Sequence, residues 1–308
     1  MSRFKLGLIG AGKIVRDQHL PALRQTPALQ LAATADPYAS LDGVPGFHDM
    51  DAMLDAHPDI EAVSICTPSA LRFETARAAL LRGRHVLLEK PPGATLSEVE
   101  ALTELARHQR VSLFAAWHSR FAPGVARAKA WLANRRIDRV HIEWKEDVRV
   151  WHPGQAWIWQ PGGMGVFDPG INALSIATAI LPAPFFLRHA RLWVPENVQA
   201  PIAAKLDFVD TQGGAIAADF DFRQTGAQTW DIHVESDGHS LSLTQGGCRL
   251  AIDGEMVLGE KEQEYRGLYR HFAELIETER SEVDIAPLRH VADAFLYGYR
   301  EMTEAFIE

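Results

Sequence analysis

Apolar and polar positions in the first third of the chain follow the pattern of short strands, each followed by a helix. Apolar runs predict strands at Lys5–Ile9, Leu29–Ala35, Ala62–Cys66, His85–Leu88 and Val111–Ala116. Helices are predicted from the first glycines to about Gln25, at Met50–Ala56 and Phe73–Arg82, and from a Thr95-x-x-Glu98 capping box to about His108. Strands separated by helices predict a parallel, doubly wound sheet with right-handed crossovers.

The pattern changes after Phe121. A helix at about residues 123–134, a strand at Val140–Val148 and a helix at Ile171–Leu181 come first. Strand-like runs follow at Leu187–Trp193, Ala203–Asp210, Gly214–Phe222, Gln228–Ser236 and Ser240–Gln245, and helices at about 264–279 and 287–306 close the chain. They predict an open, mostly antiparallel sheet with a helix on one face. The sequence therefore predicts an α/β protein with a first domain at 1–120 and an α+β substrate and oligomerisation domain at 121–308. The terminal helix is free in this scheme to pack back on the first domain.

Composition narrows the function. The 308 residues are 47% hydrophobic and carry a net charge of −9 without a basic block, which argues against nucleic acid as a partner. Cys66 and Cys248 lie far apart, so neither a disulfide framework nor a metal site is expected. No apolar run of about 18 residues and no cleavable leader is present, so we expect a cytoplasmic protein without a membrane partner.

A glycine-containing turn follows the first predicted strand. Gly10-Ala11-Gly12 opens a helix there, so that backbone N–H groups can approach a pyrophosphate at the helix N-terminus, as in a Rossmann domain. Lys13 and Ile14 continue this turn and are expected to contact the same cofactor. The third glycine of the G-x-G-x-x-G pattern is replaced by Val15, so the match is partial.

Asp36 ends the second predicted strand. A carboxylate at this position can accept hydrogen bonds from the adenosine ribose and would repel a 2′-phosphate. No Arg or Lys occurs in the following Pro37–Ser40, so NAD is the expected cofactor and NADP the second choice. The alternative is an Asp that only starts a turn before Pro37.

Two later strand ends carry chemistry, and ligands of open α/β sheets bind beyond the carboxyl ends of the strands. The residues expected to contact the cofactor there are Cys66, Thr67, Pro68, Glu89 and Lys90. Cys66 is expected to pack and not to act as a nucleophile, since nothing nearby would activate it. Lys90 could donate a hydrogen bond to a reacting oxygen, and Pro91, in a cis peptide or otherwise, would hold this strand end rigid.

A glycine-rich block, G-G-M-G-V-F-D-P-G-I-N, runs from Gly162 to Asn172. Pro169 suits the first position of a helix, so Asp168 is predicted to be its N-cap. Asn172 lies one turn later on the same face. A carboxylate and an amide therefore point together, although capping alone would also explain Asp168.

An aromatic loop precedes this block. Trp144, Trp151, Trp157 and Trp159 are interleaved with Glu146, Asp147, His152 and Gln160. Aromatic rings pack on the apolar C–H faces of a sugar, and carboxylate, amide and imidazole groups bind its hydroxyls. Few cations are nearby, so a neutral sugar fits better than a phosphorylated one. The alternative is that these rings form domain-interface core.

The glycine turn, Glu89-Lys90-Pro91 and the Gly162–Asn172 block, in this order over the whole chain, resemble the Gfo/Idh/MocA oxidoreductase family. The resemblance implies a Rossmann domain followed by an α+β domain with a large open sheet. It also implies hydride transfer between a sugar-like alcohol and a nicotinamide cofactor, with Lys90 and Asp168 at the catalytic site.

One position departs from the family, which usually places His four residues after the Asp. This chain has Asn172, which cannot exchange a proton. The block, with Trp117-His118-Ser119-Arg120 and Trp144-Lys145-Glu146-Asp147, resembles the aldose 1-dehydrogenase branch. That likeness implies oxidation of D-galactose, D-fucose or L-arabinose at C1 to a lactone. Trp117 is then expected at the cofactor, and the expected sugar contacts are His118, Glu146, Trp151, His152, Asp168, Asn172 and Trp230.

Several alternatives stay open at this point. Asp168 is the preferred base for the C1 hydroxyl, with Lys90 steering that hydroxyl and Asn172 fixing an oxygen, and Lys90 as the base is nearly as good. A dehydrogenase of another polyol or inositol and a non-catalytic NAD-binding sensor are the competing functions. A homodimer through the open sheet is expected, because an uncovered apolar sheet face must be buried somewhere.

Overall fold

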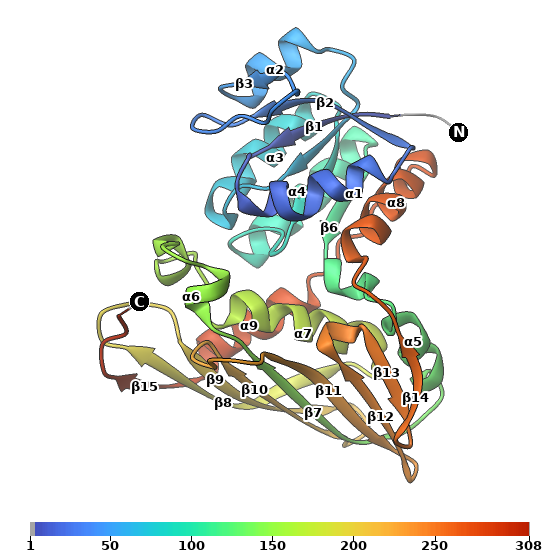
Figure 1. Cartoon of the computed structure of the whole chain (residues 1–308), viewed down its shortest axis with the longest axis vertical. Helices are drawn as coiled ribbons and strands as arrows, with labels where there is room; N and C mark the ends of the chain where they lie inside the picture. The colour runs from blue at the N-terminus through green and yellow to red at the C-terminus, as the bar shows by residue number, and fades with distance from the viewer. Residues whose placement is uncertain (1–3, 308) are drawn as a thin grey trace. The chain divides into compact units, whose positions relative to one another are not determined.

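The computed structural model describes residues 4–307 (Figure 1), which divide into two compact units. The first unit contains the chain up to His118 together with Tyr265–Ile285. The second contains Ser119–Glu264 and the chain from Ala286 onward. The first boundary lies close to the expected residue 120. A later segment returns to the first unit, but it is Tyr265–Ile285 and not the last helix of the chain.

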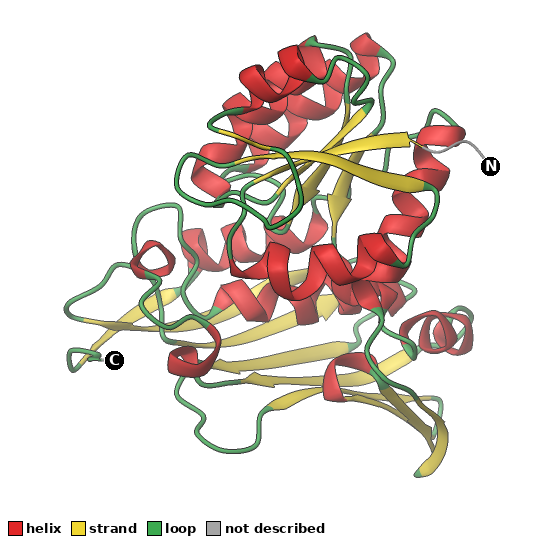
Figure 2. Ribbon diagram, turned by 45° about the horizontal axis from the view of Figure 1, so that its top comes forward, coloured by secondary structure: helices red, strands yellow, loops and turns green. Residues whose placement is uncertain are grey.

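The first unit is built on a six-stranded parallel sheet in the order β3-β2-β1-β4-β5-β6. Its strands are β1 Phe4–Ile9, β2 Leu29–Ala35, β3 Gly46–Phe47, β4 Ala62–Ile65, β5 His85–Glu89 and β6 Leu113–Ala116. Helices pack around this sheet (Figure 2): the π-helix η1 Val15–His19, α1 Leu20–Arg24, α2 Met50–Ala56, the 3₁₀ turn η2 Ser69–Leu71, α3 Arg72–Leu81, α4 Leu96–Gln109 and α8 Glu264–Glu277. The predicted doubly wound sheet and the capping box at Thr95 are both confirmed.

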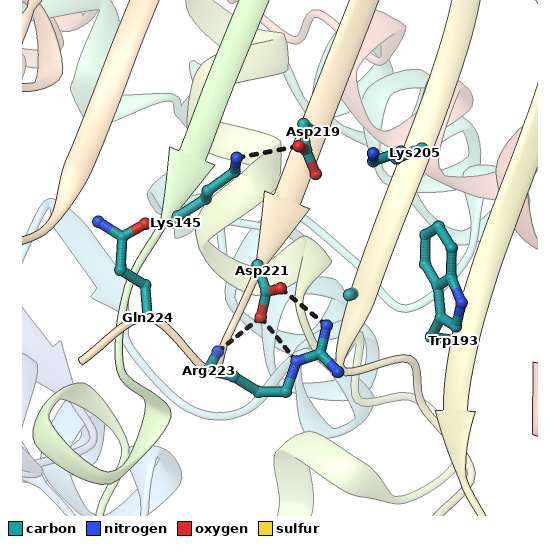
Figure 3. Close-up of a pocket in the computed structure, with 8 residues that line it drawn as sticks. Lys145, Trp193, Lys205, Asp219, Asp221, Arg223 and Gln224 are labelled. Carbon is teal, nitrogen blue, oxygen red and sulfur yellow. Dashed lines mark hydrogen bonds and ion pairs between the residues drawn. The ribbon is translucent and has the colours of Figure 1, made fainter. Parts of the chain in front are cut away.

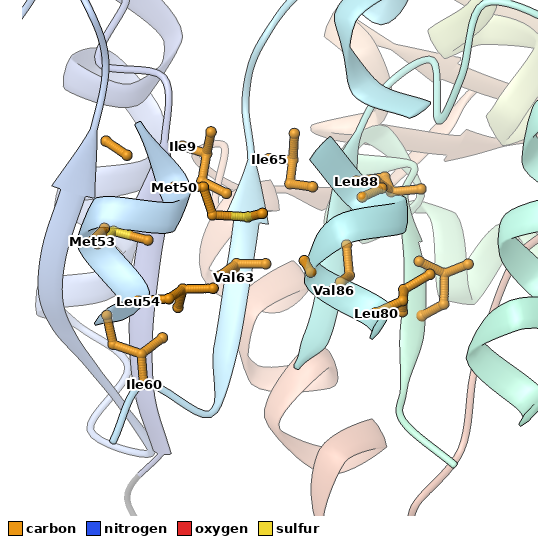
Figure 4. Close-up of a cluster of buried hydrophobic side chains, with 14 of the residues drawn as sticks. Ile9, Met50, Met53, Leu54, Ile60, Val63, Ile65, Leu80, Val86 and Leu88 are labelled. Carbon is orange, nitrogen blue, oxygen red and sulfur yellow. The ribbon is translucent and has the colours of Figure 1, made fainter. Parts of the chain in front are cut away.

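Figure 4 shows the core on one face of this sheet. Met53 and Leu54 of α2 and Leu80 of α3 pack against strand residues that include Val63 and Val86, all nearly free of solvent. Strands buried on both faces appear in the sequence as continuous apolar runs, which is why they were predictable. The packing fixes the carboxyl ends of β1, β4 and β5.

Helix α8 belongs to the first unit, which corrects the single boundary near residue 120. Its Leu268, Tyr269 and Phe272 are fully buried. Phe272 stacks on Phe114 of β6, with ring centroids 6.2 Å apart, and the Tyr269 hydroxyl donates to Ser64 Oγ of β4 at 3.2 Å. The apolar stripe of α8 therefore finds its partners in the first unit, and the expected packing-back is made by this helix and not by the last one.

The second unit contains a nine-stranded mixed sheet in the order β14-β13-β12-β11-β7-β10-β9-β8-β15. Its strands are β7 Ile137–Lys145, β8 Phe185–Pro195, β9 Ala203–Asp210, β10 Ala215–Asp221, β11 Thr229–Ser236, β12 His239–Thr244, β13 Arg249–Ile252, β14 Glu255–Gly259 and β15 Tyr299–Thr303. The pairs β7–β10 and β8–β15 are parallel and the others antiparallel, so the mostly antiparallel sheet is confirmed.

Three strands of this sheet were missed. The hairpin β13–β14 follows Gln245, and β15 replaces the end of the predicted helix 287–306, because α9 stops at Tyr297 (Ala286–Tyr297). Gly298 separates the two elements. A side chain there would lie 2.4 Å from the Ala294 carbonyl oxygen, so only glycine lets the chain turn this tightly into an edge strand.

Helices cover one face of the sheet (Figure 1): α5 Val125–Leu132, α7 Phe167–Ile180 and α9. The short α6 Val148–Trp151 and the 3₁₀ turn η4 Ala156–Trp159 lie in the aromatic loop, and the 3₁₀ turns η3 His118–Phe121 and η5 Gln245–Gly247 are connections. Along β10 the residues alternate, with Phe220 buried beneath α7 and Asp219 on the opposite face. This alternation separates a covered face from an uncovered one.

The uncovered face is charged, contrary to the apolar face expected. A depression of about 450 Å³ on it is lined by ion pairs (Figure 3). Lys145 Nζ lies 2.9 Å from Asp219 Oδ2, and Arg223 Nη2 lies 2.8 Å from Asp221 Oδ2. Paired charges tolerate water, so this face does not have to be buried.

No helix within residues 4–307 is long and apolar enough to cross a membrane.

Candidate active site

The glycine turn has the geometry of a dinucleotide cradle. Gly10 has φ +94°, and a side chain there would lie 3.3 Å from the backbone carbon of Cys66. At Gly12 a Cβ atom would meet no heavy atom within 4 Å, so the backbone faces open space. Glycine is required at the first position by its conformation and suits the second because a ligand can approach the backbone closely.

Asp36 ties the second strand to this turn. Its Oδ2 accepts the backbone N–H of Ala11 at 2.7 Å, and its Oδ1 accepts those of Tyr38 and Ala39 at 2.8 and 3.0 Å. Asp36 therefore forms the turn before Pro37, as the alternative interpretation held, and it also fixes the glycine turn through Ala11. Arg16 Nη2 donates to the Ser40 carbonyl oxygen at 3.2 Å, which brings a cation to the same loop. Arg16 lies outside Pro37–Ser40, so the residues that follow Asp36 do not reveal this cation.

The ends of β4 and β5 lie side by side, as predicted. The Thr67 hydroxyl is buried and has no hydrogen-bond partner within residues 4–307. A bound ligand could provide that partner. The Lys90–Pro91 peptide is cis. Arg72 Nη1 donates to the carbonyl oxygens of Glu89 and Pro91, so this strand end is held from both sides of Lys90. The residues present therefore fit a bound dinucleotide.

Glu89, an expected cofactor contact, makes several hydrogen bonds within the first unit. It is 3% exposed, and its Oε1 lies 3.0 Å from His19 Nε2 and accepts the Tyr265 hydroxyl at 2.7 Å. Its Oε2 accepts the backbone N–H of Lys90 at 2.8 Å. His19 Nδ1 in turn lies 2.6 Å from the Tyr269 hydroxyl. The carboxylate is engaged beneath Lys90 and positions its backbone.

The buried pair is ionic. Burial raises the pKa of Glu89, but the hydrogen bond and charge of His19, with His118 and Arg72, outweigh burial and hold that pKa well below its usual value. Burial lowers the pKa of His19, but its neighbours, among them Cys66, Tyr269 and Glu89, raise that pKa well above its usual value. A charged imidazole and a charged carboxylate therefore share the space under the strand end.

The remaining predicted residues of the first unit are placed as follows. Lys13 pairs with Asp17, and Ile14 is 38% exposed beside the glycine turn. Trp117 is 2% exposed and donates its indole N–H to the Asp284 carbonyl oxygen at 2.9 Å, so it serves packing. His118 stacks on Tyr265, with ring centroids 5.0 Å apart.

In the second unit, Asp168 is not an N-cap. Helix α7 begins at Phe167 with Val166 as its N-cap, and Asp168 lies within the first turn. Gly165 has φ +53°, and the Val166 N–H donates to the Pro201 carbonyl oxygen at 2.7 Å, which starts the helix earlier than the Asp-Pro pair predicts. The Asp168 carboxylate is thus available for other contacts.

Asp168 contacts the aromatic loop. It is 4% exposed, and its Oδ2 lies 3.4 Å from Nε2 of His152. The other ring nitrogen of His152, Nδ1, lies 3.3 Å from Gln155 Oε1. Asn172 is partly buried one turn along α7, as the spacing predicted. The structure therefore brings together two of the predicted sugar contacts.

A second group forms around Glu146, which directly follows β7 and is 5% exposed. Its Oε2 accepts the indole N–H of Trp230 at 3.0 Å. The Trp230 ring packs against Trp151, with centroids 5.4 Å apart, and against Trp144 at 6.4 Å. An aromatic surface beside a carboxylate suits a neutral sugar. Trp144 and Trp159 are buried. These two rings fit the alternative interpretation, in which the Trp residues belong to the core.

Sequence analysis missed His19, Arg72, Gln155, Tyr265 and Tyr269. Helical spacing could have indicated some of them. Val15 and His19 lie one turn apart on one helix face, and so do Tyr265 and Tyr269. No cluster of three or more metal-ligand side chains occurs in the described part of the chain.

A glycine turn after the first strand and a lysine at the carboxyl end of a later parallel strand are features of nicotinamide-dependent oxidoreductases. Residues 4–116 match a family model described as an oxidoreductase family with an NAD-binding Rossmann fold. Over all 308 residues the chain is 44% identical to galactose 1-dehydrogenase of Pseudomonas fluorescens, with 100% of both chains covered. The chain belongs to the Gfo/Idh/MocA oxidoreductase family, as its motifs predicted.

Solved structures agree. The crystal structure of D-galactose-1-dehydrogenase from Rhizobium etli matches with a TM-score of 0.95 and 56% identity, over 100% of this chain and 99% of that chain. The 3-ketoreductase KijD10 from Actinomadura kijaniata, in complex with NADP and TDP-benzene, matches with a TM-score of 0.84 at 19% identity, over 98% and 100%. The second likeness concerns the fold alone.

Proposed function

We propose that this protein oxidises an aldopyranose such as D-galactose, D-fucose or L-arabinose at C1, with NAD(P) as the hydride acceptor, to give the aldonolactone. The observation that carries the proposal is the buried Asp168 carboxylate, 3.4 Å from His152 and one turn before Asn172. Full-length similarity to two galactose 1-dehydrogenases supports the substrate class.

The sugar is proposed to lie against the aromatic surface of Trp151 and Trp230. Its hydroxyls would be bound by Glu146, His152 and Asn172, each a group that can accept or donate a hydrogen bond. His118 is a proposed contact from the first unit. The two cations next to Glu146 in the sequence, Lys145 and Arg149, are paired with Asp219 and Asp147, which favours a neutral sugar over an anionic one.

Asp168 is the proposed base for the C1 hydroxyl proton, and Lys90 the proposed donor to the C1 oxygen. When bound, the nicotinamide takes up the hydride from C1. Burial withholds water from Asp168, which favours proton uptake by a carboxylate. Asn172 holds an oxygen in place and moves no proton.

The proposed cofactor is NAD, with NADP as a second substrate. Asp36 offers its carboxylate to the ribose, although three backbone N–H groups already share it. Arg16 of η1, whose guanidinium donates to the Ser40 carbonyl oxygen, supplies the cation that a 2′-phosphate needs. A neutral sugar is the proposed partner in solution, together with a second copy of the chain.

We propose that the two copies associate through the uncovered sheet face. Trp193 and Tyr299 add aromatic surface to its ion pairs, and Tyr299 is 68% exposed. Sedimentation velocity of the wild type and of Trp193→Ala tests this idea. A monomer at every concentration of the wild type contradicts it.

The activity is tested by following the NADH or NADPH absorbance band with a panel of aldoses, polyols and inositol. Growth with D-galactose or L-arabinose supports the proposal, and Asp168→Ala should abolish turnover while the cofactor still binds. Activity with a polyol alone would identify a different dehydrogenase. A flat trace with all sugars, together with cofactor binding, would favour a non-catalytic NAD-binding protein.

A further inference from the structure

His152 lies where proton chemistry is needed, although it comes from a different segment than the histidine usual in the family. The residue one turn after Asp168 is Asn172, and an amide does not exchange a proton near neutral pH. His152, in the loop after α6, places its Nε2 3.4 Å from Asp168 Oδ2. An imidazole on a buried carboxylate restores a proton acceptor that the helix itself lacks.

The second ring nitrogen of His152 defines the tautomer. Nδ1 lies 3.3 Å from Gln155 Oε1, and an amide oxygen only accepts, so Nδ1 carries the hydrogen. The neutral ring then presents the lone pair of Nε2 to Asp168. In this state Asp168 Oδ2 and His152 Nε2 are both acceptors, so a proton taken up by Asp168 can be shared between them and passed to the ring.

The solvent exposure of Asp168 and His152 indicates the direction in which a proton can move. The Asp168 side chain is 6% exposed, whereas the His152 side chain is 17% exposed. The Phe222 ring, 5.8 Å from the imidazole, makes an apolar wall on one side. Asp147, the N-cap of α6, and Arg149 on α6 are paired with each other at 2.8 Å. A proton on Asp168 therefore has a route toward water through His152.

We propose that His152 relays the C1 hydroxyl proton from Asp168 to solvent. The inference rests on the proposed function. The O–H bond at C1 breaks and its proton goes to Asp168, while the C1–H electron pair leaves as hydride and C1 becomes the lactone carbonyl. The proton then passes from Asp168 Oδ2 to His152 Nε2 and on to water. The sum is one aldose and one oxidised cofactor giving one lactone, one reduced cofactor and one proton.

The test compares His152→Gln with the wild type and with His108→Gln, a matched control at an exposed position near the end of α4. Glutamine keeps hydrogen bonding but cannot carry the proton. We expect kcat for D-galactose to fall by about 100-fold in His152→Gln, in the range typical of lost acid–base catalysis. The sugar KM should change by no more than about threefold, and the limb of the kcat pH profile that reports the pair should disappear. An unchanged kcat and pH profile would overturn the relay.

A measurement without turnover separates this inference from the proposed function. In protein with labelled histidine, NMR follows the titration of His152 in the wild type and in Asp168→Asn. The carboxylate stabilises the protonated ring, so the midpoint should fall by one pH unit or more when the charge is removed. An unchanged midpoint refutes the pair even if the sugars are oxidised, whereas a shifted midpoint without sugar oxidation refutes only the proposed function.

Discussion

The buried His19–Glu89 pair makes a quantitative prediction for stability. His19 Nε2 and Glu89 Oε1 are 3.0 Å apart, and their side chains are 0% and 4% exposed. His19→Gln removes the cation in direct contact with the carboxylate. The variant can then keep Glu89 charged and buried, at a cost of about 3–5 kcal/mol, or protonate it on folding.

The protonation route sets how the loss depends on pH. The pKa of Glu89 is lowered by folding, so its contribution is present above the unfolded value of 4.5 and is lost as pH falls through the folded pKa. The pKa of His19 is raised, so its contribution is complete below the unfolded value of 6.5 and is lost as pH rises through the folded pKa. Between these values the wild type neither gains nor loses protons on folding at this pair.

In His19→Gln, a protonated Glu89 binds one extra proton on folding above pH 4.5. The deficit relative to the wild type should therefore grow by about 1.4 kcal/mol per pH unit. It reaches about 3 kcal/mol near pH 6.5 and then levels off, because the wild type also loses stability as unfolded His19 deprotonates.

Urea unfolding of both proteins at several values between pH 4.5 and 7.5 measures this deficit. The variant His19→Gln/Glu89→Gln is the control, since it removes both charges and should recover most of the stability. A deficit below 1 kcal/mol at pH 6.5 would refute a buried ionic pair, whereas a larger deficit that does not change with pH would show that Glu89 stays charged in the variant.

Three further predictions concern single contacts. Arg16→Ala should weaken NADP binding about tenfold and NAD binding less than twofold in fluorescence titrations, in line with one lost charge-assisted hydrogen bond; equal losses would exclude a role at the 2′-phosphate. Gly165→Ala should destabilise by about 3 kcal/mol, since its Cβ would lie 2.2 Å from a backbone oxygen, whereas Gly213→Ala, strained in φ but unobstructed, should cost about 1 kcal/mol in thermal unfolding. Trp230→Phe removes the donor to Glu146 and should raise the sugar KM about tenfold with little change in kcat; a fall in kcat alone would place Trp230 elsewhere.

The first five predicted strands of the first unit were found because their signals are local, whereas the two-residue strand β3 and the return of α8 to this unit were not predicted. Its strands are short apolar runs buried on both faces, and Lys90 stands at a strand end where parallel topology places ligands. The edge strands of the second unit lack this signal. Met256 and Val257 of β14 are exposed, so no alternation marks that strand, and only Gly298 divides α9 from β15.

Residues that depend on distant contacts were the ones misjudged. The start of α7 is set by a hydrogen bond from Val166 to Pro201, which the Asp-Pro pair cannot reveal. The partners of Glu89, His19 and Tyr265, were not predicted because they come from segments on either side of it, far away in the chain. Local sequence shows that a polar group is present, and tertiary structure decides which partner it takes.

Residues beyond the carboxyl ends of parallel strands tend to bind ligands, and this rule applies to the second unit as well as to the first. The sequence predicted it for the first unit only. Strands β7 and β10 lie side by side and parallel in the centre of the second sheet, with Lys145 opposite Asp221. Their carboxyl ends therefore meet at one edge, where the Glu146 N–H donates to the Asp221 carbonyl oxygen at 2.9 Å. Chain that leaves the two ends supplies Glu146 and His152 from one side and Phe222 from the other. A parallel pair inside a mostly antiparallel sheet thus concentrates polar side chains at one edge, as parallel strands do in the first unit. The proposed proton route through His152 lies at this edge, so a substitution that shifts the β7–β10 register should damage sugar oxidation and leave cofactor binding intact.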